Sequence, residues 1–170
     1  MIKPAVFLLI KTKKDVFSLI KTIGSNKNIK WSSAVYGPYQ VIAYVDHTDE
    51  KALAQEVEKI RTIKGVEELD ARMVKIIPQD DKLENFETIK GEAAVLLINV
   101  DYKIEKERVV TWNLRKIKGV KWARAMWGPA DIIAIVEADN HESMRDLICD
   151  DVKVLKGVKN NSTYYCYPKK

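Results

Sequence analysis

The sequence carries one pattern twice, in residues 5–78 and again in residues 94–168, about ninety residues apart. Each copy is too long for one member of a stacked repeat array, so the duplication predicts two folding units rather than a solenoid. The matched segments are Lys30-Trp31 with Lys121-Trp122, Gly37-Pro38 with Gly128-Pro129, Ile42-Ala43 with Ile133-Ala134, and Lys64-Gly65-Val66 with Lys156-Gly157-Val158.

Length and composition fit two small soluble domains. A chain of 170 residues could form one domain or two, and the repeat favours two units of about eighty residues each. With 46% hydrophobic and 31% charged residues, we expect the chain to fold throughout. The apolar run from Ala5 to Ile10 is too short for a signal peptide or a membrane span, which indicates a cytoplasmic protein. Cys149 and Cys166 lie only in the second copy, so free thiols are expected.

Each copy reads as strand, helix, strand, strand, helix, strand. Continuous apolar runs predict buried strands, apolar residues three or four apart predict helices, and Gly-Pro marks the turn between the second and third strands. In copy one the strands are expected at 5–10, 30–36, 41–45 and 66–77, with helices from Val16 to Ile23 and from Glu50 to Lys64-Gly65. In copy two the strands are expected at 94–100, 121–127, 131–137 and 158–167, with helices at 104–117 and 140–153, the latter started by a capping box of Asp139 and Glu142.

This order predicts an α+β fold of two tandem ferredoxin-like (βαββαβ) domains. In such a domain both helices cover one face of a four-stranded antiparallel sheet whose middle strands are the first and third. The middle strands are apolar on both sides, whereas a half-solvated sheet would alternate. We therefore expect the copies to pack sheet to sheet as an intramolecular pseudo-dimer, like a dimeric α/β barrel. The expected domains are 1–78 and 93–170, joined by a polar linker, 79–92, with a short helix at 82–89.

The second copy carries the most specific motif, Gly128-Pro129-Ala130-Asp131-Ile132-Ile133-Ala134, with Lys-Gly-Val before its second and fourth strands. With the order of elements, these residues resemble the effector-binding (RAM-type) domain of Lrp/AsnC transcription regulators, in which a Gly-x-x-Asp turn precedes an apolar strand. Copy one departs from the motif, because Gln40 stands in place of the aspartate. The first strand begins by residue 5, so we expect no helix-turn-helix domain before it.

The resemblance implies a non-enzymatic module that senses a small molecule, such as an amino acid, near these turns. It further implies ligand-dependent assembly into a homo-oligomer of pseudo-dimers, or pairing with helix-turn-helix-bearing relatives. An amino acid needs an acidic acceptor, donors for its carboxylate and a pocket. The ordinary alternative is that Gly-Pro and Asp simply form a turn. The candidate ligand-binding residues are Gly128, Asp131, Trp127 and Arg124 or Lys121 in copy two, and Tyr36, Gly37 and Gln40 in copy one.

Two other functions remain open. The net charge of +5 and a pI of about 9.0 suit nucleic-acid binding, but the lysines are interspersed with acids and the sheet faces are apolar, so we expect no direct binding to nucleic acid. A metal-binding or catalytic protein is the third class, because duplicated ferredoxin-like units also build small α/β-barrel oxygenases and heme or metal enzymes. His47 and His141 have no partner at ligand spacing, so no catalytic residue, metal or cofactor is expected.

Overall fold

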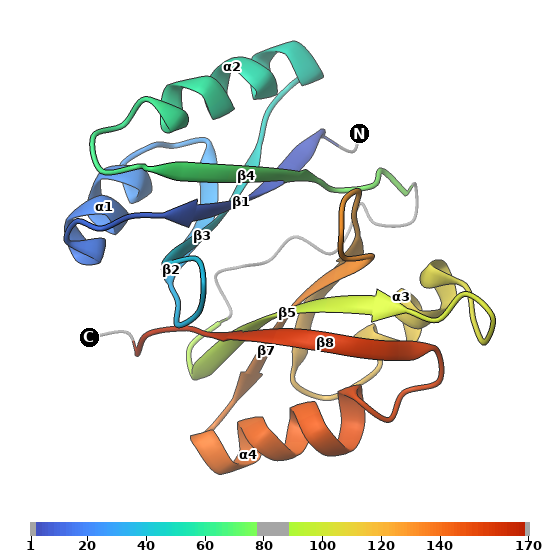
Figure 1. The fold of residues 1–170 in the computed structure, drawn as a ribbon. Coiled ribbons are helices and arrows are strands. Elements are labelled where there is room, and N and C mark those ends of the chain that lie inside the picture. Colours follow the sequence, from blue (N-terminus) through green and yellow to red (C-terminus); the bar gives the residue numbers. More distant parts are fainter. Residues whose placement is uncertain (1–2, 78–88, 169–170) are drawn as a thin grey trace. The chain divides into compact units, whose positions relative to one another are not determined.

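The computed structural model describes residues 3–77 and 89–168, and the chain divides into two compact units, Met1–Lys82 and Leu83–Lys170 (Figure 1). The first unit contains β1 (Ala5–Lys11), α1 (Val16–Gly24), β2 (Ile29–Ala34), β3 (Val41–Asp46), α2 (Glu50–Arg61) and β4 (Glu68–Met73). The second contains β5 (Glu92–Val100), α3 (Glu107–Arg115), β6 (Val120–Ala125), β7 (Ile132–Ala138), α4 (His141–Asp146), the π-helical segment η3 (Leu147–Val152) and β8 (Val158–Tyr165). The predicted linker helix at 82–89 falls almost wholly outside the described residues.

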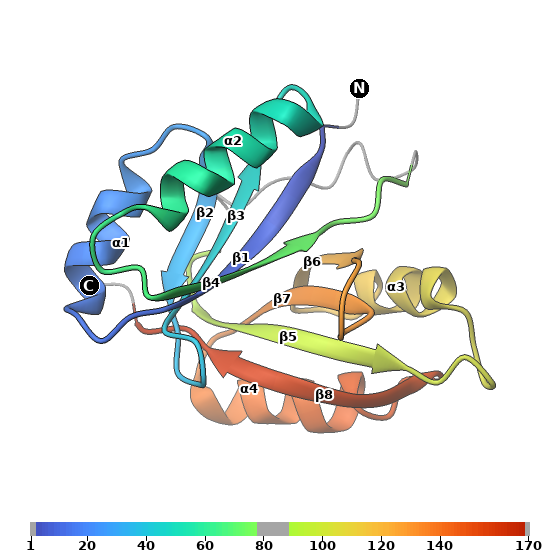
Figure 2. The same ribbon diagram turned by 45° about the horizontal axis from the view of Figure 1, so that its top comes forward.

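Both units have the same topology. Each sheet has four strands, in the order β2-β3-β1-β4 in the first unit and β6-β7-β5-β8 in the second, and all its neighbouring strands are antiparallel. Within each unit both helices lie on one face of its own sheet (Figure 2). The predicted α+β fold of two ferredoxin-like units is therefore confirmed.

The core of each unit lies between its sheet and its helices. In β1, Val6, Leu8 and Ile10 face the helices and pack with apolar residues of α1 and α2. The alternate side chains of this strand, Phe7 and Leu9, lie on the helix-free face and are buried as well. The middle strands are thus apolar on both sides because both of their faces are buried.

Helix starts differ from the sequence-based expectation in the second unit. The helix predicted from residue 104 begins at Glu107, because residues 101–106 form a loop instead. The capping box at Asp139 is wrong: helix α4 begins at His141, so Asn140 occupies the N-cap and its side chain accepts a hydrogen bond from the Ser143 amide at 2.8 Å. Among the described residues, no helix is long and apolar enough to cross a membrane.

Candidate functional site

The turn between β6 and β7 is tied to the end of β5 through Asp131. Gly128 has a φ of 128°, a backbone conformation that glycine adopts without a steric cost. The Asp131 amide donates to the Ile98 carbonyl at 3.0 Å, and its carbonyl accepts from the Met126 amide at 2.9 Å. One oxygen of its side chain, Oδ2, accepts from the Val100 amide at 2.8 Å. Asp131 therefore joins two strand ends through both its backbone and its carboxylate.

The other carboxylate oxygen of Asp131 accepts a hydrogen bond from Tyr102, in the loop that follows β5. The Tyr102 hydroxyl lies 2.8 Å from Asp131 Oδ1 and 2.9 Å from Glu107 Oε2. Partial burial, the hydrogen bonds to these two carboxylates and their negative charge together raise the pKa of Tyr102 well above its ordinary value. Tyr102 thus stays protonated, and an ammonium ligand at Asp131 would share the carboxylate with Tyr102 and Val100. Binding of a ligand by this turn stays a prediction.

The corresponding turn of the first unit uses an uncharged side chain in the same way. Gln40 accepts a hydrogen bond through Oε1 from the Thr12 amide at 2.9 Å. Its Nε2 donates to the carbonyls of Pro38, at 3.2 Å, and Gly37, at 3.4 Å, and Gly37 has a φ of 150°. The Gln40 side-chain amide therefore closes the turn and also joins it to the end of β1.

The remaining predicted ligand-binding residues lie in different environments. Trp127 and Tyr36 are 64% and 55% exposed, beside their respective turns. Lys121 Nζ lies 3.7 Å from Glu137 Oε1. Arg124, by contrast, is 1% exposed within β6, so the structure places it in the sheet and not at the turn.

Arg124 lies on the helix-free face of the second sheet. Ala123, the residue before Arg124, pairs with Ala134 of β7, and both alanines belong to the core that faces the helices. Because side chains alternate along a strand, Arg124 and its paired residue Ile133 face the opposite side of the sheet. The Arg124 guanidinium lies 5.9 Å from the ring centre of Trp122, which is also buried. The two side chains thus form a buried cation–aromatic contact on the helix-free face of the second sheet.

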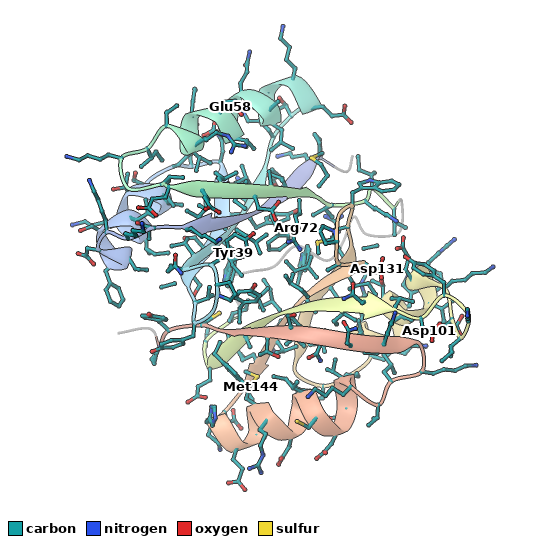
Figure 3. All side chains as sticks on the ribbon, in the orientation of Figure 1. Tyr39, Glu58, Arg72, Asp101, Asp131 and Met144 are labelled. Carbon is teal, nitrogen blue, oxygen red and sulfur yellow. The ribbon has the colours of Figure 1, made fainter. Side chains whose placement is uncertain are left out.

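The first unit carries a polar cluster on its own helix-free face. Arg72 Nη2 and Nε lie 2.9 and 3.0 Å from Asp70 Oδ2, and the Arg72 side chain is 10% exposed. The Tyr39 hydroxyl donates to the same oxygen at 3.4 Å, and Lys11 Nζ lies 5.4 Å from the centre of the Tyr39 ring. Figure 3 labels Tyr39 and Arg72 on this face, and Asp131 near the end of β5. The cluster places one cation, Arg72, and one phenol on the Asp70 carboxylate, while Lys11 pairs with Glu68 at 3.1 Å.

Sequence reasoning did not select these residues. Glu68-Leu69-Asp70-Ala71-Arg72 alternates, with Leu69 in the core, and this period of two could have placed Asp70 and Arg72 together on the other face. The second unit has Ser162 and Tyr164 at the equivalent register, opposite Leu97 and Val95. The polar groups of the two helix-free faces have therefore diverged between the copies. No such sequence pattern pointed to Tyr102, because the loop that carries it has no counterpart of equal length in copy one.

Comparison with known proteins shows that several solved structures have a similar fold. The sequence matches no protein-family model and no curated protein. The siroheme decarboxylase NirDL superposes with a TM-score of 0.67 at 8% identity, over 95% of this chain and 70% of that one. The putative chlorite dismutase TA0507 gives a TM-score of 0.60 at 8% identity, over 99% of this chain and 96% of that one. AsnC of E. coli gives a TM-score of 0.41 at 22% identity, over 45% of this chain and 53% of that one.

These likenesses correct the predicted function. The structures that match along the whole chain are described as a decarboxylase and a dismutase, which are enzymes. The prediction of a non-enzymatic module for amino-acid sensing and transcription regulation is therefore wrong, and so is the prediction that the protein is not an enzyme. The motif at Gly128–Asp131 misled because its hydrogen bonds serve the ferredoxin-like turn itself, and a turn alone does not specify a function.

Proposed function

We propose that the protein is an enzyme that binds a carboxylate-bearing iron tetrapyrrole as its substrate and removes carboxyl groups from it. The observation that carries this proposal is Arg124, buried on a sheet face with its guanidinium beside the ring of Trp122. Arginine binds carboxylates through two parallel hydrogen bonds, and an aromatic side chain stacks on a flat macrocycle. NirDL, which shares the fold over 95% of this chain, has been solved with an iron-uroporphyrin III analogue. This small-molecule substrate replaces the predicted amino acid; the homo-oligomer stays a prediction.

The first unit carries a different arginine, Arg72, on its helix-free face; Arg72 lies on β4, whereas the register counterpart of Arg124 in the first unit is Ser33. Arg72 already pairs with Asp70, so the guanidinium is held in one orientation on the helix-free face. A substrate carboxylate could accept from the N–H groups that point away from Asp70, because a guanidinium has five donors. Arg72 is thus a second arginine that could bind a carboxylate of a tetrapyrrole, within the first unit alone.

A permanently bound heme does not fit the described residues. A heme iron commonly needs a histidine on the face of a pocket. His47 follows β3 in a surface loop, and its Nδ1 accepts from the Thr48 amide at 2.9 Å. His141 is exposed at the start of α4, with its ring 5.6 Å from that of Tyr165. Neither histidine lies on the face that carries Arg72 or Arg124, so the tetrapyrrole is proposed as a substrate and not as a cofactor.

The proposed reaction needs no external oxidant. The carbon–carbon bond to the carboxylate breaks, carbon dioxide leaves, and a proton takes its place on the side-chain carbon. The contribution of the protein is to hold the carboxylates and to exclude water from the sheet face.

The test is a titration with iron uroporphyrin III, followed by absorption spectroscopy, and an anaerobic incubation with siroheme, followed by mass spectrometry. We expect saturable binding and a product that has lost carbon dioxide. Arg124→Gln should weaken binding by about tenfold, as expected for a lost charge-assisted contact. The matched control is Arg108→Gln, since Arg108 stacks on Trp112 at 4.6 Å on the surface of α3 and should not affect binding. Absence of saturable binding, or equal losses in the two variants, would contradict the proposal.

A further inference from the structure

The first unit contains an open pocket between the start of α1 and the turn that leads into β4. The pocket has a volume of about 460 Å³, which is the size of a small-molecule site. Its lining residues are Lys14, Asp15, Ser18, Leu19, Thr22, Lys64 and Gly65. The Asp15 carboxylate is already engaged by the Phe17 amide and the Ser18 hydroxyl, both at 3.0 Å. Lys14 and Lys64 have no ion-pair partner among the residues that the structure describes.

In the second unit, a longer loop of the chain itself occupies the position equivalent to this pocket. Three residues connect Thr12 to Val16, whereas six connect the equivalent Val100 to Glu107. The longer loop is fixed over the turn by a hydrogen bond from the Asp101 amide to the Gly157 carbonyl, at 2.8 Å. The second unit therefore shows which group this fold can hold at the position of the pocket.

The group that fills the second unit is a carboxylic acid side chain. A Cβ added to Gly157 would lie 2.7 Å from Glu105 Cβ, so Glu105 packs directly on the glycine. Its Oε2 lies 4.0 Å from Lys156 Nζ, and Lys156 is the counterpart of Lys64. At Gly65 the same added atom would meet only Lys14 and Thr12, at an ordinary 3.8 Å. The first unit thus has the equivalent lysine and glycine, Lys64 and Gly65, but lacks the glutamate that contacts them in the second unit.

We infer that the first unit binds a small organic carboxylate in this pocket, with the ligand taking the position that Glu105 holds in the second unit. Lys14 and Lys64 neutralise the carboxylate, and Leu19 contacts its carbon chain. The two lysines disfavour a ligand that presents an ammonium group. This site does not depend on the proposed tetrapyrrole chemistry, because none of its residues belongs to the helix-free face.

The test is a titration of the full chain with succinate, followed by amide chemical shifts in ¹H–¹⁵N NMR spectra. We expect saturable shifts for one site per chain, centred on the amides of Ser18, Thr22 and Gly65. Lys64→Ala should weaken binding by about tenfold, and the matched Lys156→Ala variant should leave it unchanged. The same spectra establish that each variant is folded.

Three results would overturn the inference. They are an absence of saturable shifts, an unchanged affinity in Lys64→Ala, and equal shifts of the same amides with sulfate at the same ionic strength. The last result would mean that the lysines attract any anion and that no carboxylate site exists.

Discussion

Gln40 and Asp131 make the same hydrogen bond in the two units. Gln40 Oε1 accepts from the Thr12 amide at 2.9 Å, and Asp131 Oδ2 accepts from the Val100 amide at 2.8 Å. An amide and a carboxylate are thus interchangeable for joining this turn to the first strand of its unit. The second carboxylate oxygen of Asp131 has a partner of its own, the Tyr102 hydroxyl.

Asp131→Ala should therefore destabilise the second unit. The substitution leaves the Val100 amide without its acceptor and the Tyr102 hydroxyl with Glu107 alone, and we expect a loss of about 1–3 kcal/mol in the free energy of unfolding. Asp131→Asn retains an amide oxygen, as Gln40 does, and should cost less. Urea denaturation followed by tryptophan fluorescence measures both values. Equal stability of wild type and Asp131→Ala would contradict this role.

Tyr102 should make stability depend on pH in the alkaline range. Its pKa in the folded state is raised above the unfolded value of about 10, so the folded state retains the phenolic proton more tightly. The resulting stabilisation is complete below about pH 10 and is lost as the pH rises above it. Urea midpoints measured from pH 8 to pH 11 should fall more steeply for wild type than for Tyr102→Phe. Parallel slopes for the two proteins would show that the phenol is not shifted.

The fold could be predicted from the sequence because its signals are local and occur twice. Apolar runs such as Ala5–Ile10, helical spacing and the Gly-Pro turns identify the elements, and the repeat supports each assignment a second time. The start of α3 could not be predicted, since the loop at 101–106 continues a polar, helix-compatible pattern and is fixed by a contact with Gly157, distant in sequence.

The functional residues were harder to predict for a physical reason. Arg72 and Asp70 approach each other because of strand period, but a pair of charges on an edge strand also suits a solvated surface. Arg124 follows Trp122 in a strand with alternating character, and only the paired strand β7 establishes that its side chain is buried. The Gly128–Asp131 motif was visible, yet its hydrogen bonds serve the turn.

Gly119 should tolerate no side chain. Its φ is 99°, and an added Cβ would lie 2.8 Å from Leu147 Cδ2 and 2.9 Å from the carbonyl oxygen of Glu137. Backbone strain and this overlap should together cost Gly119→Ala about 2–4 kcal/mol in the free energy of unfolding. Gly24→Ala is the control, because nothing lies within 4 Å of its added Cβ, and it should change stability by less than about 1 kcal/mol. Thermal unfolding of both variants, followed by circular dichroism, gives the comparison, and similar losses would contradict the prediction.

Glu56 should be the most important charged residue of α2 for stability. Its side chain is buried and accepts hydrogen bonds from the side-chain amides of Asn26 and Asn28, the latter at 3.2 Å, so it fixes the chain between α1 and β2. Glu56→Ala leaves two amide groups without their acceptor, and we expect a loss of about 1–3 kcal/mol, with a smaller loss for Glu56→Gln. Glu58→Ala on the same helix removes only an exposed pair with Arg61, at 3.3 Å, and should change stability by less than about 1 kcal/mol. Urea denaturation of the three variants tests this, and a loss in Glu58→Ala as large as that in Glu56→Ala would mean that helix propensity, and not the buried hydrogen bonds, determines the effect.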